Sequence, residues 1–192
     1  MEQFVHLHNH TEFSLLDGAA KISDLVKETK ARGWNALAIT DHGNMYGCLQ
    51  FYTACLGAGI KPIVGCEFYI CEDLTVKQGK VDVGHLVLIA KNNQGYKNLL
   101  KLNSIAFIDG YYYRPRIDYK TLSKYSEGLI CLSGCIAGHL PKLILQHRMT
   151  EAVEFALKLK DMFDDGDFYL EIQNHGIPEQ KDIIVGLDKL GK

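Results

Sequence analysis

Short apolar runs rich in β-branched residues alternate with helical patterns along the whole chain of 192 residues. The helical patterns repeat apolar residues three and four positions apart, whereas the short runs lack that spacing. About six such alternations predict an α/β fold with a mainly parallel sheet, either a barrel or a doubly wound sheet. The expected strands are residues 4–8, 36–40, 61–69, 86–90, 129–132 and 168–173. The expected helices are residues 23–32, 46–58, 94–106, 118–125, 150–162 and 178–190.

Local signals indicate where several elements begin and end. Gly33 and Gly59 follow two helical patterns, and glycine most easily takes the left-handed conformation that ends a helix. Ser23 and Asp118 are residue types that favour the N-cap position. The hydrophilic residues 72–80 indicate a loop or hairpin inserted after the third strand. The sequence indicates no internal domain boundary.

Charge and composition exclude several classes of protein. The 21 Lys and Arg residues nearly balance the 23 Asp and Glu residues, so any contact with nucleic acid must be local. The sequence has no apolar run of about 18 residues and no signal-peptide pattern at its start. We therefore expect a soluble, cytoplasmic protein without a membrane partner. The six cysteines form no CxxC pair, which favours reduced thiols.

Histidines and carboxylates gather where the expected strands end, which is where parallel βα folds place their active groups. His8 and His10 are two positions apart on an extended segment, so both imidazoles point to one side. His42 and Glu67 lie near the ends of two further strands, and Asp17 lies on the first loop. A catalytic metal site needs three or four such ligands and an open position, and a carboxylate can bridge two ions. The sequence therefore predicts a metal centre.

These residues also have structural interpretations. A strand histidine is often a core residue with a backbone hydrogen bond, which is the favoured interpretation for His6 and an even alternative for His8 and His10. Asp41 is expected to shape a turn or to orient the neighbouring histidine. Asp17 could equally be a turn residue. The remaining histidines, expected to be surface or structural residues, are His139, His147 and His175.

Residues 4–18 (FVHLHNHTEFSLLDG) resemble the opening motif of the PHP (polymerase and histidinol phosphatase) domain family. The run is most similar to the version at the N-terminus of the alpha subunit of bacterial DNA polymerase III. Further similar segments follow in family order across essentially the whole chain. They are residues 38–43 (AITDHG), 59–69 (GIKPIVGCEFY), 84–88 (GHLVL), 112–118 (YYRPRID), 128–135 (GLICLSGC) and 168–175 (FYLEIQNH).

The resemblance implies a distorted (β/α)7 barrel that holds up to three divalent metal ions, with Zn or Mn favoured for such ligands. The ligands implied by position are His8, His10, Asp17, His42, Glu67, His85 and Cys135. Cys135 could instead be a buried thiol. His85 begins its strand, so a parallel barrel would place it at the wrong end. Only an irregular or reversed path would bring it to the metals.

The resemblance also implies that residues 1–192 are the N-terminal part of a PHP domain, with six of seven strands and without the last strand's Asp-x-His motif. The palm, thumb and fingers of the polymerase are absent. The expected partners are therefore the rest of the alpha subunit, a DNA 3′ end and an exonuclease subunit of the replicase.

The implied function is phosphoester hydrolysis as a 3′–5′ proofreading exonuclease in DNA replication, within a DNA-directed DNA polymerase. One alternative is a non-catalytic scaffold that binds a separate exonuclease subunit. Another is a free-standing phosphatase of small phosphate monoesters. Arg114 and Arg116, beside the tyrosines at 111–113, are candidate nucleic-acid contacts, and the alternative there is a packed loop fixed by Pro115.

Overall fold

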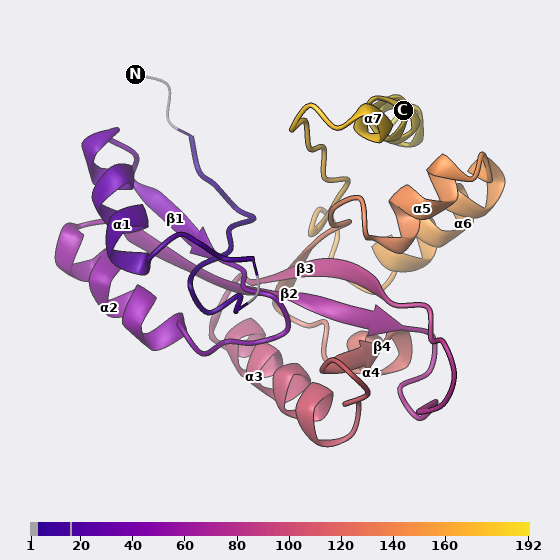
Figure 1. Ribbon diagram of the computed structural model, residues 1–192, viewed down its shortest axis with the longest axis horizontal. Coiled ribbons are helices and arrows are strands. Elements are labelled where there is room, and N and C mark those ends of the chain that lie inside the picture. Colours follow the sequence, from indigo (N-terminus) through magenta and orange to yellow (C-terminus); the bar gives the residue numbers. More distant parts are fainter. Residues whose placement is uncertain (1–3, 16) are drawn as a thin grey trace.

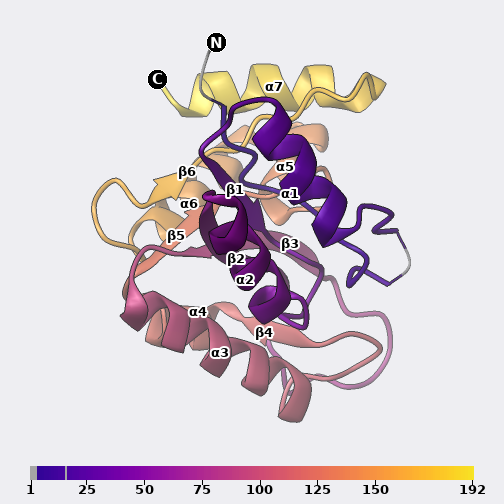
Figure 2. The same ribbon diagram turned by 90° about the vertical axis from the view of Figure 1, so that its left-hand side faces the viewer.

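The computed structural model describes residues 4–15 and 17–192. Over these residues six strands form one sheet, and helices pack around it (Figures 1 and 2). The strands are β1 (Ala36–Ile39), β2 (Lys61–Cys71), β3 (Gly84–Ala90), β4 (Arg116–Asp118), β5 (Leu129–Leu132) and β6 (Phe168–Tyr169). The helices are α1 (Ile22–Ala31), α2 (Cys48–Ala58), α3 (Asn93–Ile108), α4 (Tyr119–Lys124), α5 (His139–Leu145), α6 (Met149–Lys160) and α7 (Pro178–Leu190). In this part of the chain, none of the helices is long and apolar enough to cross a membrane.

The sheet is mixed, with the order β1-β2-β3-β5-β6 and with β4 paired to β2 outside this path. β1 and β4 pair in parallel with β2, and β6 pairs in parallel with β5. β3 runs antiparallel to both β2 and β5. The connection from β2 to β3 contains the predicted inserted loop and no helix, so the chain turns back as in a hairpin. The predicted α/β fold is confirmed, with one strand reversed.

Two strands share one edge of β2, which is eleven residues long. β1 pairs with the first four residues of β2, and β4 pairs with the last three. Between these partners the chain that follows β1 continues beside β2, where His42 and Glu67 form an isolated parallel bridge. This continuation places the His42 side chain next to that of Glu67.

The N-terminal segment does not form the strand predicted for residues 4–8, although it runs beside β1. The Ala38 backbone N–H donates to the His6 carbonyl (3.1 Å). The Asn9 side-chain amide donates to the same carbonyl and to that of Ala38 (3.0 and 3.2 Å). The Asn9 side chain therefore occupies backbone carbonyls that would accept interstrand hydrogen bonds in a regular β-ladder. The segment nevertheless carries His8 and His10 along the edge of the sheet.

Alternation along the strands separates a helix-covered face from an inner face. Phe68 of β2 and Leu88 of β3 belong to the core beneath α3, α4 and α6. Val87 and Ile89 of β3 belong to a small inner cluster, and Glu67 lies on this inner side. A second core joins α1 and α2 to β1, and a third joins α5, α6 and α7.

The predicted helix ends are mostly confirmed. Gly33 and Gly59 follow α1 and α2 with φ of 71° and 74°. Asp118 caps α4 and accepts a hydrogen bond from the backbone N–H three residues on. The prediction that Ser23 caps α1 is wrong, because Ser23 lies inside the helix. The carboxylate of Glu12, from the preceding loop, accepts a hydrogen bond from the first helical N–H (2.8 Å).

Two short elements, β4 and α5, were not predicted, and β6 is shorter than predicted. β4 has three residues and α5 has seven, which is too short for a clear periodicity. β6 contains only the first two residues of the expected strand 168–173. Beyond it, the Glu171 backbone N–H donates to the Ser133 hydroxyl (2.8 Å) and not to a strand carbonyl. Residues 169–175 instead line a cleft.

Candidate metal centre

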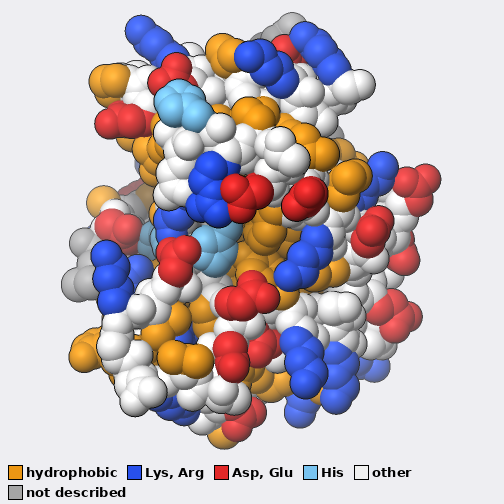
Figure 3. All heavy atoms as spheres, turned by 90° about the vertical axis from the view of Figure 1, so that its right-hand side faces the viewer, with side chains coloured by type: hydrophobic (Ala, Val, Ile, Leu, Met, Phe, Trp, Pro, Cys, Tyr) orange, Lys and Arg blue, Asp and Glu red, His pale blue; other side chains and the backbone are white. Residues whose placement is uncertain are grey.

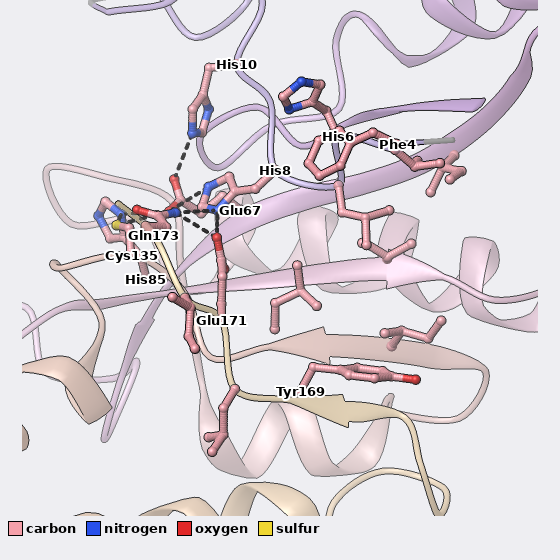
Figure 4. A pocket seen from close by; sticks show the side chains of 18 of the residues that line it. Phe4, His6, His8, His10, Glu67, His85, Cys135, Tyr169, Glu171 and Gln173 are labelled. Carbon is pink, nitrogen blue, oxygen red and sulfur yellow. Dashed lines mark hydrogen bonds and ion pairs between the residues drawn. The ribbon is translucent and has the colours of Figure 1, made fainter. Parts of the chain in front are cut away.

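The carboxylate of Glu67 is the centre of a histidine cluster. Its side chain, in the second half of β2, is only 1% exposed. Its Oε1 atom lies 3.2 Å from His8 Nε2 and 3.2 Å from His85 Nδ1. Its Oε2 atom lies 3.5 Å from His10 Nε2 and faces His42 Nδ1. Four imidazoles from three separate segments thus converge on one buried carboxylate, and Figure 4 shows three of them.

Asp17 and Cys135 extend this cluster on two sides. Asp17 Oδ2 lies 3.0 Å from His42 Nε2, so His42 has a carboxylate at each ring nitrogen. The Asp17 side chain is 62% exposed and forms the rim of the cluster. Cys135 Sγ lies 3.5 Å from Glu67 Oε1 and 3.7 Å from His85 Nδ1. The structure therefore brings together all seven residues that the sequence put forward as ligands.

Two groups within the cluster have the spacing of metal ligands, and both contain Glu67. One group adds His8 and His10, the other adds His42 and His85, and the ligand atoms of each group lie within 4.8 Å of one another. Glu67 Oε2 and His42 Nδ1 are buried and face each other as an ion pair, and His10 lies at the same oxygen, so both oxygens of this carboxylate face imidazoles. Imidazole nitrogens and carboxylate oxygens are metal donors. The cluster therefore fits divalent metal ions, with Glu67 placed between the two groups.

The position of His85 follows from the reversal of β3. His85 begins β3, which in a parallel sheet would put it far from the ends of the other strands. Because β3 is antiparallel to β2, its first residues lie beside the last residues of β2, and His85 pairs with Tyr69. The reversed path on which the assignment of His85 depended is the path observed.

Electrostatics divide the histidines into a charged and a neutral member. Burial lowers the pKa of His8, but the carboxylates of Glu171 and Glu67 outweigh it and raise the pKa to about 10. Burial and the neighbouring charge of His42 lower the pKa of His10 to about 4. Burial disfavours ionisation of Glu67, yet hydrogen bonds from three histidines hold its pKa well below the usual range. Without a bound ion, neutral pH thus leaves His8 protonated beside an ionised Glu67.

Glu171, a residue that the sequence reasoning missed, fixes the orientation of His8. Glu171 Oε1 lies 2.6 Å from His8 Nδ1, on the side of the ring opposite Glu67. Gln173 donates a hydrogen bond from Nε2 to the same oxygen (2.7 Å). A carboxylate on the second nitrogen of a ligating histidine sets its tautomer and ring orientation. The signal was present, because Glu171 and Gln173 are two positions apart in the second half of the expected strand 168–173.

Asp41 organises the loop that supports His10 and His42. Its buried carboxylate accepts hydrogen bonds from the Thr11 N–H, the Thr11 hydroxyl and the Ser14 hydroxyl (2.6 to 2.7 Å). The Ser14 hydroxyl also lies 3.2 Å from His10 Nδ1 and accepts a hydrogen bond from the His42 N–H (3.1 Å). This agrees with the expectation that Asp41 shapes and orients the loop.

Two sequence interpretations are wrong. Arg116 is fully buried and is not a surface contact for nucleic acid. Its guanidinium donates to the carbonyls of Gly110, Leu74 and Val76, so it fastens two loops together. The sequence could not separate it from the exposed Arg114, because the burial of a three-residue strand gives no periodic signal. His6 is not a core residue, because its side chain is exposed and packs against Trp34.

A cleft of about 1150 Å³ extends from the metal cluster along the inner face of the sheet. Its apolar wall includes Ile63, Ile89 and Ile130, and its sides are residues 4–8 and 169–175. In Figure 4 the labelled Phe4 and Tyr169 lie toward the end of the cleft away from Cys135. An apolar cleft with polar groups converging at one end is typical of a small-molecule or active site.

The chain is similar to proteins of known families in sequence and in fold. The model of the PHP domain family matches residues 6–175. The DNA polymerase III subunit alpha of Borreliella burgdorferi is 51% identical over 182 residues, which cover 93% of this chain and 16% of that protein. That of Treponema pallidum is 47% identical over 184 residues and is likewise covered to 16%. The chain thus spans about a sixth of the length of these curated relatives. A Bifidobacterium adolescentis structure assigned as a metal-dependent phosphoesterase has a TM-score of 0.57 at 16% identity, covering 98% of this chain and 84% of that chain.

Proposed function

The chain belongs to the PHP domain family, and we propose that the cluster around Glu67 is a divalent-metal site for phosphoester hydrolysis. One observation carries this proposal: the buried carboxylate of Glu67 belongs to both groups of ligand spacing. A structural ion pair needs one imidazole, whereas four imidazoles share this one carboxylate.

The ligand chemistry favours transition metals. His8 and His10 would hold one ion with Glu67, and His42 and His85 would hold a second with the same carboxylate. Cys135 and Asp17 are further donors at the two ends of the cluster, and a third ion in a complete domain would draw on Asp17. Imidazole with carboxylate and thiolate suits Zn, and imidazole with carboxylate also suits Mn.

Divalent ions supply Lewis-acid chemistry in such sites, because they activate water near neutral pH and neutralise charge on a phosphate. The chain itself prepares the ligands. Glu171 fixes the ring of His8 from behind. His10, with its pKa lowered to about 4, is neutral and can donate its lone pair without first losing a proton. The apolar wall of the cleft limits water beside the reacting phosphate.

We further propose that residues 1–192 are the N-terminal part of a PHP domain in a cytoplasmic replicative polymerase. The much longer DNA polymerase III alpha relatives support this. The substrate would then be a DNA 3′ end, removed in the 3′ to 5′ direction. The partners would be the rest of the alpha subunit and an exonuclease subunit.

The test is elemental analysis of the purified chain together with a hydrolysis assay on 3′-labelled single-stranded DNA and on bis(p-nitrophenyl) phosphate. We expect bound Zn or Mn and hydrolysis of both substrates. Glu67→Gln should remove both properties, whereas Glu72→Gln, which neutralises an exposed carboxylate in the following loop, should keep them. Bound metal without hydrolysis of either substrate would contradict the proposal and favour the scaffold. The monoester p-nitrophenyl phosphate is assayed alongside, and hydrolysis of this substrate alone would favour the phosphatase.

A further inference from the structure

A second groove, of about 870 Å³, lies next to the metal centre. One side is residues 79–83, from the loop between β2 and β3, and the other is residues 112–114, which precede β4. Lys142 of α5 and Gln146, the residue that follows α5, contribute a third side. The groove lies outside the ligand cluster and includes Arg114 and two of the tyrosines at 111–113.

Tyr69 links this groove to the metal centre. Its ring lies 5.0 Å from the ring of His85 and 6.1 Å from the ring of His42, measured between centroids. The guanidinium of Arg114 lies over the Tyr69 ring, 4.8 Å from its centre. An aromatic ring and a cation therefore lead from the candidate ligands to the groove in two steps of about 5 Å each.

The cations of the groove are available for a ligand. Arg114 is exposed, and no carboxylate of the described residues forms an ion pair with it. Lys80 is exposed and is likewise without an ion pair in residues 4–15 and 17–192. Lys142 pairs with Asp82 at 2.8 Å, and Asp82 also lines the groove. Three cations against one carboxylate give this groove a local positive charge. Figure 3 shows acidic and basic side chains interspersed over the face that carries α5 and α6.

Tyr113 is the feature that the fold itself does not explain. Its side chain is 82% exposed, so its burial contributes little to stability. Its φ is +58°, a left-handed conformation that glycine would adopt without strain and tyrosine adopts at a cost. Tyr112 holds it in place, because the Tyr112 hydroxyl donates to the Gly79 carbonyl across the groove (3.0 Å) and the two rings lie 4.6 Å apart. A large exposed ring in a strained position suits contact with a flat ligand.

We propose that this groove binds single-stranded nucleic acid and leads its end to the metal centre. Arg114 binds a phosphate next to the one that would be hydrolysed, Tyr113 stacks on a base, and Lys80 contacts the backbone further out. Exposed aromatic rings between cations are the pattern of strand-binding grooves, since every base offers a face to stack on. An acidic peptide would use the cations but would leave Tyr113 without a role. The direction toward the metals rests on the proposed function, whereas the binding of the strand does not.

The test measures binding of a fluorescein-labelled, phosphorothioate-linked oligothymidylate to the metal-loaded protein by fluorescence anisotropy, since this linkage resists hydrolysis. Tyr113→Ala should weaken binding about 5- to 100-fold, the range that the loss of one stacked base gives. Tyr113→Phe should bind like the parent protein. Arg114→Ala should weaken binding and reduce the salt dependence by about one phosphate contact. Arg32→Ala is the matched control, because it removes an exposed arginine on α1 that also lies over an aromatic ring.

Unchanged affinity in both Tyr113→Ala and Arg114→Ala would overturn the proposal. Equal losses in Arg114→Ala and Arg32→Ala would overturn it too, because they would show attraction by charge alone. Competition by poly-glutamate as strong as that by unlabelled oligothymidylate would favour an acidic protein partner. Hydrolysis of bis(p-nitrophenyl) phosphate separates the two proposals. Arg32→Ala should keep this hydrolysis, and if the parent protein has none, the proposed function fails while strand binding can still be measured.

Discussion

Two clusters of histidine and carboxylate meet at neighbouring residues of β3. His85 belongs to the candidate metal centre, and the ring of His139 packs over Gly84, at the position a Cβ atom would occupy. In the second cluster the Tyr119 hydroxyl bonds to His139 Nδ1, and His139 Nε2 lies 3.4 Å from Asp82, which also pairs with Lys142. Every one of these polar groups has a partner. In the first cluster four imidazoles share one buried carboxylate.

This difference separates a candidate ligand histidine from a structural one. Both clusters place a largely buried imidazole against a carboxylate, but the Asp82 side chain is 75% exposed, whereas that of Glu67 is 1% exposed. The number of imidazoles that share the carboxylate also differs. His139 has the Tyr119 hydroxyl at one nitrogen and Asp82 near the other, whereas four imidazoles converge on Glu67 with the spacing of metal ligands.

The largest effect is expected when histidines are removed from each cluster in turn. Replacing His8 and His10 together by Ala should remove most of the bound metal and reduce hydrolysis by more than about 100-fold, since loss of a mere supporting partner already costs 10- to 100-fold. His139→Ala should leave the metal content unchanged. It should instead destabilise the fold by about 1 to 3 kcal/mol, because the buried Tyr119 hydroxyl loses its partner. Elemental analysis and thermal unfolding measure both results.

If His139→Ala removed as much metal as the double variant, the contrast between the clusters would be wrong. The same conclusion would follow if the double variant kept its metal.

A smaller effect concerns stabilisation by the ion itself. Metal at 100 times its dissociation constant should add about 2.7 kcal/mol to the free energy of unfolding. For a chain of this size, that raises the melting temperature by about 5 to 10 °C. The shift should persist in His139→Ala and disappear in Glu67→Gln. A shift in all three proteins would place the ion elsewhere.

Glu171→Gln tests the support behind His8. The change keeps the size of the side chain but removes the charge beside His8 Nδ1. We expect metal affinity to fall about 10- to 100-fold, as for other partners of ligating histidines. Titration with Zn in a competitive chelator measures the affinity. Glu179→Gln, which changes a residue in the first turn of α7, is the control. Equal affinities in the two variants would mean that Glu171 does not position His8.

The smallest effect is a pH dependence in the second cluster. Burial, helped by the charge of Lys142, lowers the pKa of His139 below 6.5. The folded state therefore holds fewer protons than the unfolded state, so stability should fall as the pH drops from 6.5 through the lower folded pKa, by at most about 1.4 kcal/mol per pH unit. In His139→Gln the melting temperature should depend less on pH over this range. An unchanged pH dependence would mean that another group causes it. The groups that face His139 are Asp82, Glu72, Tyr119, Lys142 and His85.

The sequence indicated which candidate ligands lie together better than it indicated the paths of the chain that bring them together. Strand ends pointed to His42 and Glu67 because polar residues after an apolar run are visible locally. The position of His85 required the reversal of β3, which depends on pairing between distant strands and leaves no local pattern. Glu171 and Arg116 show the same limit. Their roles depend on which residues face them across the fold, namely His8 from the N-terminal segment and the carbonyls of two loops.

The reversal of β3 also has a consequence for the order of folding. Glu67 and His85 are 18 residues apart in the sequence and meet across a hairpin-like pair, whereas His8 and Glu171 are 163 residues apart. Closing a long loop costs more entropy than closing a short one, and local pairs form earlier. During synthesis, half of the candidate centre can therefore form around β2 and β3 while the rest of the chain is still emerging. Pulsed hydrogen exchange should show the β2–β3 amides protected before the contacts of residues 4–10 with 169–175.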